Sequence, residues 1–298
     1  MPEITVRQLE YFLAVVDHGS ISAAARQLHI SQAAISVAIR QLEKGLNAEL
    51  LNRAPARRAL PTPAGQALLP HARRVTTAIS DATEAVSNDH SEIRGVLRVV
   101  SSMTVSPHVL PRLVAHFTAE HPAVEVTIAE ATVPEIHQVL RSGQADLGFV
   151  YARQSAEDLD ETLIGTNQHH VMVHAEHPLA GRPGILLREL IHEPMIMVDI
   201  PPSVERVTQI ITDLGLRPRV QWSSSNFETV RSLVGHGLGW AFVNVTPRTE
   251  VTYDGRKVAY VPILDDIPAN PIIALTAPSE ELPARVREAL RHLQDQKV

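Results

Sequence analysis

The stretch from Ser20 to Gly45 predicts two helices joined by a tight turn, and this pair of helices constrains the rest of the chain. Ser22 is placed to cap the first helix, and the alanines that follow it are strong helix formers. Ser31 is placed to cap the second helix, after a turn at His29. The second helix is expected to end at Gly45, a residue type common at helix ends.

The second predicted helix has one apolar face and one face of short side chains. Ile35, Ile39 and Leu42 are spaced four and three residues apart, so they share a face and pack inward. Short side chains let a helix lie deep in a DNA major groove, where Gln and Ser can reach base edges. The residues predicted to contact DNA from this helix are Ser31, Gln32, Ala33, Ser36, Val37 and Arg40. A generic helical hairpin with no role in DNA binding is the alternative.

Residues on both sides of the turn carry a family resemblance. They are Leu9-Glu10-Tyr11-Phe12-Leu13-Ala14-Val15-Val16, Gly19-Ser20-Ile21-Ser22-Ala23-Ala24-Ala25, Leu28, Ser31-Gln32-Ala33-Ala34-Ile35-Ser36 and Ile39-Arg40-Gln41-Leu42-Glu43. This ordered motif closely resembles the amino-terminal winged helix-turn-helix of LysR-type transcriptional regulators. The resemblance implies a regulator that binds double-stranded DNA and carries a carboxy-terminal effector-binding domain. The length of 298 residues fits two or three domains.

Segments on either side of the helix pair complete the predicted DNA-binding domain. Residues 6–17 predict a first helix that packs inward through Leu9, Phe12, Leu13 and Val16. The residues after Gly45 predict a two-stranded wing. Its cations Arg53, Arg57 and Arg58 are expected to face phosphate or the minor groove. A solvated basic loop is the alternative for the wing.

The distribution of charge supports this interpretation. The whole chain has a net charge of -6, which is unusual for a DNA-binding protein. Residues 20–75, however, carry eight cations and two anions, whereas residues 91–298 are acidic. A basic patch on an acidic body is consistent with one face that binds phosphate.

A long helix beginning at Thr62, with Pro63 in its first position, is expected to mediate dimerisation. Apolar residues recur in it with alternating spacings of four and three, which is the repeat of a coiled coil. They are Leu68, Ala72, Val75, Ile79, Ala82 and Val86. We therefore expect a homo-oligomer, a dimer through residues 63–90 and further a tetramer. An amphipathic helix that packs only on its own chain is the alternative.

From Gly95 onward, short strands alternate with helices, which is typical of a mainly parallel sheet. The strands are expected at 96–101, 124–129, 146–151, 170–174, 195–198, 219–223, 240–243 and 271–276. Further motifs continue the resemblance in order; they are Leu110-Pro111, Phe117, His121-Pro122, Val124, Gly143-Gln144-Ala145-Asp146-Leu147 and His177-Pro178-Leu179-Ala180. The effector domain of the family is similar to type 2 periplasmic binding proteins, with two α/β lobes around a cleft.

The predicted fold class is therefore α/β with an amino-terminal all-α winged helix-turn-helix. The predicted domains are 1–62 for DNA binding, 63–90 for the dimerisation helix and hinge with a polar linker at 88–91, and 91–298 for the effector. Within the last, lobe I comprises 91–163 plus 270–298, and lobe II comprises 164–269.

The effector is expected beyond the carboxyl ends of strands, where ligands bind in open α/β folds. Three such ends carry hydroxyl or amide groups that lead into helices, and helix amino-termini favour a carboxylate. The predicted effector-binding residues are Ser101, Ser102, Thr104, Thr132, Ser225, Asn226 and Phe227. Simple helix capping is the alternative for each. The expected ligand is a small anionic metabolite, and no cofactor is expected.

Several classes of function are disfavoured. Cysteine is absent, so disulfides and thiol catalysis are excluded. No catalytic residues are assigned, because the chain has neither a Gly-x-Ser-x-Gly elbow nor a phosphate-binding loop ending in Gly-Lys-Ser/Thr. No metal site is assigned at His169, His170, His174 and His177, because strand alternation separates the first two. Without an apolar membrane span or a secretory signal before Tyr11, we expect a cytoplasmic protein.

The expected mechanism is a change of lobe closure on effector binding that repositions paired DNA-binding domains and alters DNA bend. RNA polymerase is a further candidate partner. Two rival functions remain open from the sequence. One is an effector-independent DNA-binding protein, and the other is an enzyme on a binding-protein-like fold.

Overall fold

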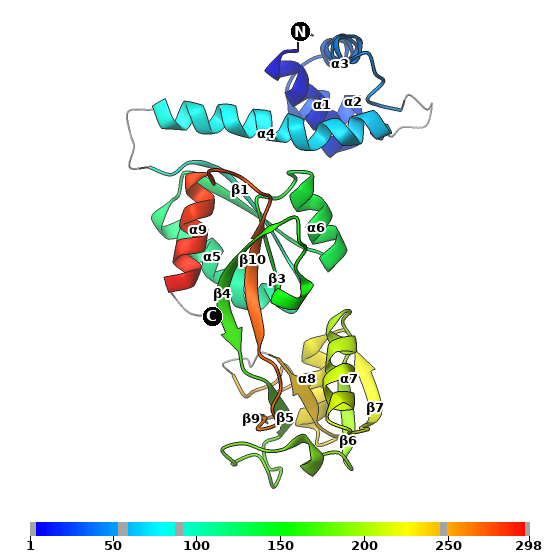
Figure 1. The fold of residues 1–298 in the computed structure, drawn as a ribbon, viewed down its shortest axis with the longest axis vertical. Coiled ribbons are helices and arrows are strands. Elements are labelled where there is room, and N and C mark those ends of the chain that lie inside the picture. The colour runs from blue at the N-terminus through cyan, green and yellow to red at the C-terminus, as the bar shows by residue number, and fades with distance from the viewer. Residues whose placement is uncertain (1–3, 53–58, 87–91, 245–248, 296–298) are drawn as a thin grey trace. The chain divides into compact units, whose positions relative to one another are not determined.

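Three short helices at the amino-terminal end pack on one another (Figure 1). The computed structural model describes residues 4–52, 59–86, 92–244 and 249–295. The three helices are α1 (Val6–His18), α2 (Ile21–Gln27) and α3 (Gln32–Leu46). The helix pair predicted between residues 20 and 45 is therefore confirmed.

Two predicted helix ends were wrong by two residues. Ser20, not Ser22, caps α2, because its extended backbone lets Ser20 Oγ accept a hydrogen bond from Ala23 N at 3.1 Å. Gly45 lies inside α3, which ends at Leu46, and the residue that caps this end is Asn47, whose φ of 51° is in the left-handed region. Asn tolerates this conformation, so it replaces glycine as the residue after the helix.

The core of these helices is continuous and apolar. Phe12, Ile35 and Leu42 are fully buried, and Ala24 on α2 is equally buried, so the helices cross closely. The inward face predicted for α1 is confirmed: Leu9, Phe12 and Leu13 are buried, and Val16 is half-buried and packs against the same core.

A buried carboxylate joins α3 to the segment that follows it. Glu43 is 7% exposed, and its Oε1 accepts hydrogen bonds from Leu50 N at 3.0 Å and from Leu51 N at 3.4 Å. Leu51 in turn forms an antiparallel bridge with Pro61. This bridge is the part of the predicted wing that lies within the described residues. Glu43 therefore fixes the base of the wing against the end of α3.

Replacing Glu43 with alanine should destabilise the amino-terminal helices by about 2–6 kcal/mol, because each of the two buried N–H groups left without an acceptor costs about 1–3 kcal/mol. Glu43→Gln keeps an oxygen acceptor and should cost less. The measurement is amide hydrogen exchange of residues 4–52 in the full chain. Equal protection of Leu50 and Leu51 in the alanine variant and the wild type would contradict this role.

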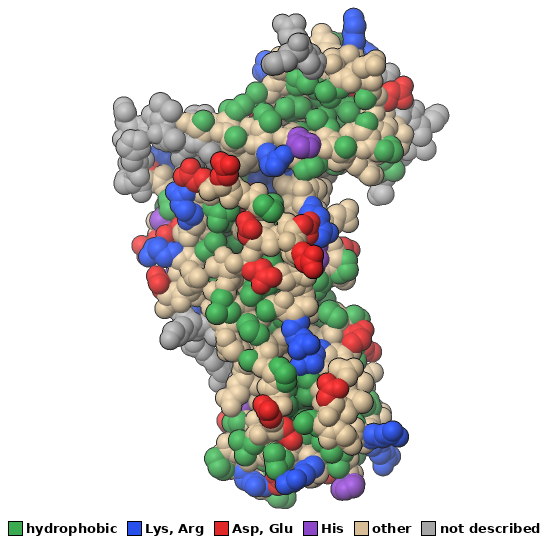
Figure 2. All heavy atoms as spheres, in the orientation of Figure 1, with side chains coloured by type: hydrophobic (Ala, Val, Ile, Leu, Met, Phe, Trp, Pro, Cys, Tyr) green, Lys and Arg blue, Asp and Glu red, His purple; other side chains and the backbone are tan. Residues whose placement is uncertain are grey.

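Helix α4 (Pro63–Val86) begins as expected, with Thr62 Oγ1 accepting a hydrogen bond from Gly65 N at 3.1 Å. Gly65 is required here, because a Cβ at this position would lie 2.1 Å from Leu50 O. Ala72 is buried against α1–α3, so this position of the predicted seam packs within its own chain. Val75 and Ile79 remain 42% and 43% exposed, and apolar side chains gather over this helical region in Figure 2.

A five-stranded sheet follows, with strand order β2-β1-β3-β10-β4. The strands are β1 (Gly95–Ser101), β2 (Val124–Glu130), β3 (Leu147–Tyr151), β4 (Asp160–Asn167) and β10 (Asn270–Thr276). Its helices are α5 (Ser106–Glu120), α6 (Val133–Arg141) and α9 (Ala284–Asp295). Helices α5 and α9 lie on one side of the sheet and α6 on the other (Figure 1).

Parallel pairing at this sheet brings strand ends together. β1 pairs in parallel with β2, which aligns Ser101 with Glu130, and with β3, which aligns Ser101 with Phe149. At the opposite end, Asp146 Oδ2 accepts a hydrogen bond from Arg98 N at 2.7 Å. This hydrogen bond orders the start of β3 beside β1.

The remaining strands form two smaller sheets. β5 (His170–His174) pairs in antiparallel fashion with β8 (Ala241–Val243) and β9 (Val258–Pro262). β6 (Pro194–Val198) pairs in parallel with β7 (Arg219–Ser224), and the helices are α7 (Ser203–Asp213) and α8 (Phe227–Gly235). The sheets are therefore mixed, and the expectation of a mainly parallel sheet was wrong for this part of the chain.

The chain divides into two compact units. One comprises residues 1–149, 155–162 and 274–295, and the other comprises 150–154, 163–273 and 296–298. The predicted linker at 88–91 lies outside the described residues. Among the helices of the described residues, none is both long enough and apolar enough to cross a membrane.

Candidate DNA-binding and effector sites

Helix α3 presents a face of short side chains to solvent. Ser31, Gln32, Ala33 and Arg40 are exposed, Val37 is 44% exposed and Ser36 is half-buried. The opposite face is buried, with Ile35 at 0% and Ile39 at 4% exposure. The face predicted to contact DNA is therefore on the outside of the domain.

Local hydrogen bonds set the start of α3. Ser31 Oγ accepts a hydrogen bond from Ala34 N at 3.2 Å, which confirms its predicted role as the cap. The preceding turn contains His29, whose φ of 54° is left-handed, and Ile30 N donates to Ala25 O at 3.0 Å. This tight turn lets α2 and α3 pack closely and holds the amino-terminal end of α3 at the surface.

The predicted wing can be placed only at its base. Asn52 N donates to Leu60 O at 2.8 Å and Thr62 N donates to Leu50 O at 3.0 Å, which continues the antiparallel bridge between Leu51 and Pro61. Arg53, Arg57 and Arg58 lie outside the residues that the structure describes. Sequence reasoning missed Glu43, the carboxylate that anchors this base. The burial of Glu43 depends on its hydrogen bond with the backbone N–H of Leu50, seven residues away.

The first predicted effector group lies where β1 leads into α5. Ser101 is fully buried, and its Oγ donates to Ser102 O at 3.2 Å. Ser102 is 8% exposed, and its Oγ is buried with no hydrogen-bond partner among the described residues. Thr104 is half-buried, and α5 begins without a side-chain cap. A buried hydroxyl without a partner normally requires an explanation, such as a ligand or an ordered water.

A carboxylate also lies at this end of α5. Ser106 Oγ donates a hydrogen bond to Glu130 at the end of β2, a contact that sequence reasoning missed. A hollow of about 700 Å³ runs beside this pair, lined by Ser106, Pro107, Leu110, Pro111, Val114, Ala115, Ile128, Ala129 and Glu130. Of the predicted effector residues, none lines this mostly apolar hollow.

Two of the other predicted effector residues, Thr132 and Asn226, act in helix capping. Thr132 is exposed, and its Oγ1 donates to Glu135 Oε2 at 2.7 Å, which holds the pKa of that carboxyl below its usual value. Asn226 Oδ1 accepts hydrogen bonds from Glu228 N at 2.9 Å and Thr229 N at 3.1 Å, so it caps α8. These contacts match the capping alternative, and the structure places Ser225 as an exposed residue beside this cap.

The histidines near β5 have separate partners. His169 is 6% exposed; its Nδ1 lies 3.0 Å from Asn244 Oδ1 and its Nε2 lies 3.1 Å from Pro268 O. Burial lowers the pKa of His169, so the neutral ring is favoured. His177 Nε2 lies 3.0 Å from Glu193 Oε2. These contacts give the two residues different structural roles.

Comparison with known proteins identifies the two parts of the chain. Residues 6–66 match the family model of the bacterial regulatory helix-turn-helix protein, lysR family, and residues 90–297 match the LysR substrate binding domain. A putative LysR family transcriptional regulator from Pseudomonas aeruginosa has a similar structure, with 30% identity, coverage of 99% of both chains and a TM-score of 0.64.

Curated relatives agree with these matches. The chain is 27% identical over 232 residues to the HTH-type transcriptional regulator CysL of Bacillus subtilis, covering 78% of this chain and 77% of CysL. It is 26% identical over 298 residues to the transcriptional dual regulator OxyR of Escherichia coli, covering 98% of this chain and 96% of OxyR. The chain therefore belongs to the LysR family: it is a DNA-binding transcriptional regulator with an effector-binding domain, and it is not an enzyme.

Proposed function

We propose that this regulator recognises its operator by inserting α3 into the DNA major groove, with Ser31, Gln32, Ala33, Ser36, Val37 and Arg40 at the base edges and phosphates. The observation that carries the proposal is the exposed face of α3, which is opposite the buried Ile35 and Ile39. Gln and Ser can donate to and accept from bases, and an exposed valine suits the methyl group of thymine. In this proposal Arg53, Arg57 and Arg58 face DNA phosphates or the minor groove beside the helix.

We infer that the effector is a small carboxylate held at the start of α5. The buried, unpartnered Oγ of Ser102 is a hydrogen-bond donor for such a ligand, and Ser101 and Thr104 flank it. The amino-terminus of α5 adds a partial positive charge. Thr132, Ser225, Asn226 and Phe227 stay candidates at the other strand ends. Because the chain contains no cysteine, its response to the effector uses no thiol chemistry.

The regulator acts as a homo-oligomer in this proposal. Val75 and Ile79 are exposed on α4 one turn apart, and apolar positions at this spacing match the seam of a paired helix. A dimer through residues 63–90 presents two copies of α3, and pairing of dimers gives a tetramer. RNA polymerase contacts the assembly at the promoter, and the effector changes the arrangement of the DNA-binding domains.

Selection of duplexes from a random pool by the full chain tests this function. We expect an inverted repeat with half-sites about one helical turn (~34 Å), or a multiple of it, apart, because a two-fold dimer reads a two-fold site. Affinity should fall steeply as salt is raised, since phosphate contacts release counterions. Failure to enrich any duplex at low salt would contradict the proposal, and an enriched single half-site would contradict the dimer alone.

A further inference from the structure

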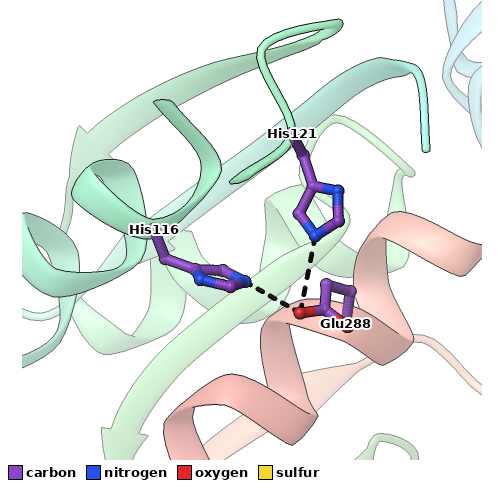
Figure 3. Close-up of side chains that lie close together, drawn as sticks. All are labelled: His116, His121 and Glu288. Atoms are coloured by element: carbon purple, nitrogen blue, oxygen red, sulfur yellow. Dashed lines mark hydrogen bonds and ion pairs between the residues drawn. The ribbon is translucent and has the colours of Figure 1, made fainter. Parts of the chain in front are cut away.

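Two histidines and a glutamate converge between the carboxy-terminal end of α5 and helix α9 (Figure 3). His116 lies near the carboxy-terminal end of α5, His121 follows the end of that helix, and Glu288 lies on α9. Glu288 Oε1 lies 2.8 Å from His116 Nε2 and 3.6 Å from His121 Nε2. The side chains are only 12%, 19% and 10% exposed for His116, His121 and Glu288.

The spacing of these three atoms suits one metal ion. The candidate ligand atoms all lie within 4.8 Å of one another. With zinc bonds of about 2.0–2.1 Å to nitrogen and oxygen, two ligand atoms of a tetrahedral site lie about 3.4 Å apart. The distance from His121 to Glu288 already fits this value, and the distance from His116 to Glu288 needs to open by about half an ångström. Rotation of the Glu288 side chain can supply that movement.

The chemistry of the three groups also fits a transition metal. Two imidazoles and one carboxylate form a ligand set used for zinc, with a fourth position left for water or substrate. The ring of His292 stacks on that of His116 at 3.7 Å, which restricts the rotation of His116.

One cation competes for the carboxylate. Arg291 Nε lies 3.0 Å from Glu288 Oε2, and Arg291 Nη2 lies 2.7 Å from Glu288 Oε1. The Arg291 side chain is 64% exposed, so it can swing into solvent when another cation takes its place. The alternative is an ion-pair network that binds no metal. It predicts that loss of Arg291 does not increase the affinity for zinc.

We propose that His116, His121 and Glu288 bind one divalent transition-metal ion, with zinc as the best match, and so link α9 to α5. The ligands are nitrogen and oxygen atoms without thiolate, which suits zinc, nickel, copper and cobalt and disfavours magnesium. The site lies at the opposite end of α5 from Ser102, so it is distinct from the proposed effector site. It does not depend on which effector or operator this regulator recognises.

Zinc binding by the full chain, measured by competition with a chromophoric chelator, tests the proposal. We expect one zinc site that His121→Asn weakens by at least about 100-fold, since even loss of an outer partner of a metal ligand costs about 10–100-fold. Glu288→Gln should have a similar effect. His236→Asn is the matched control, because His236 pairs with Asp254 at 2.9 Å in an exposed pair outside this cluster.

Two further readouts separate the site from an ion-pair network. Arg291→Gln removes the competing cation and should tighten zinc binding roughly 2- to 5-fold, the usual worth of an exposed ion pair. Cobalt should bind in place of zinc with the intense visible absorption of a tetrahedral site, and His121→Asn should abolish this band. Circular dichroism of the free variants checks that they fold.

Each outcome decides the proposal. Zinc affinity in the wild type no tighter than in His121→Asn or Glu288→Gln would overturn it. Weaker zinc binding in Arg291→Gln would also overturn it, because Arg291 would then support the site and not compete for it. A tetrahedral cobalt band that is lost in His121→Asn and kept in His236→Asn supports it.

Discussion

Replacing Val37 with glutamate lowers the affinity of this regulator for its operator by at least about 100-fold, because a like charge placed against another at an interface costs several kcal/mol. Val37 is 44% exposed on α3, so the new carboxylate is accommodated without disturbing the core. In the bound state it would lie against base edges and between phosphates. The measurement is the dissociation constant for the selected duplex at fixed salt.

Thr208→Glu is the control for this experiment. Thr208 is exposed on α7, and its Oγ1 donates to Val204 O at 2.8 Å, so the variant adds the same charge in the compact unit that does not contain α3. Its affinity for DNA should match that of the wild type. Equal affinities for the Val37 variant and the control would show that the exposed face of α3 does not meet DNA.

Removing the hydroxyl of Ser102 separates ligand binding from folding. A hydrogen bond to a charged group contributes about 1.5–3 kcal/mol, so Ser102→Ala should weaken binding of the carboxylate effector roughly 10- to 150-fold. The same variant should leave the stability of the free protein unchanged or slightly raised, because it removes a buried hydroxyl that has no partner. Thr104→Ala should likewise lose the effector response and keep DNA binding.

The experiment begins with a thermal-shift screen of carboxylic metabolites on the full chain, and the strongest hit is then titrated by calorimetry. Thr118→Val is the matched control, because Thr118 is exposed on α5, the helix that follows Ser102, and its Oγ1 donates to Val114 O at 2.8 Å. Unchanged affinity of the hit for Ser102→Ala would contradict the assignment of Ser102.

The helical periodicity of the amino-terminal part made its fold predictable. The spacing of Ile35, Ile39 and Leu42 identified the buried face of α3, and these residues are almost fully buried. Helix ends were less predictable, since Ser20 and Ser22 are both good caps and only the path of the backbone selects Ser20. The exposed face predicted for DNA binding followed from the same periodicity.

Strands β4 and β9 were missed in the sequence. β4 (Asp160–Asn167) is mostly polar, and Ile164 is the one residue of this strand that is buried. Its sequence therefore shows no clear alternation of apolar and polar residues. β9 (Val258–Pro262) lies beside turn residues and pairs with β5, which is far away in sequence. Such pairings depend on tertiary context, which local patterns do not contain.

The candidate sites also depend on tertiary contacts that the sequence pattern does not contain. Ser102 was singled out as a hydroxyl at a strand end, but only the structure shows that its Oγ is buried without a partner. Thr132 and Asn226 had the same sequence pattern, and the structure gives them hydrogen bonds within helix caps. The cluster of His116, His121 and Glu288 joins residues about 170 positions apart, so spacing along the chain could not predict it.

Protection of the operator from dimethyl sulfate tests the central claim most directly, because this reagent methylates guanine N7 in the major groove and adenine N3 in the minor groove. With the full chain bound, we predict protection of guanine N7 in both half-sites, and its loss in Val37→Glu at a concentration that still binds DNA. A bound duplex with fully reactive guanine N7 in both half-sites would contradict insertion of α3 into the major groove.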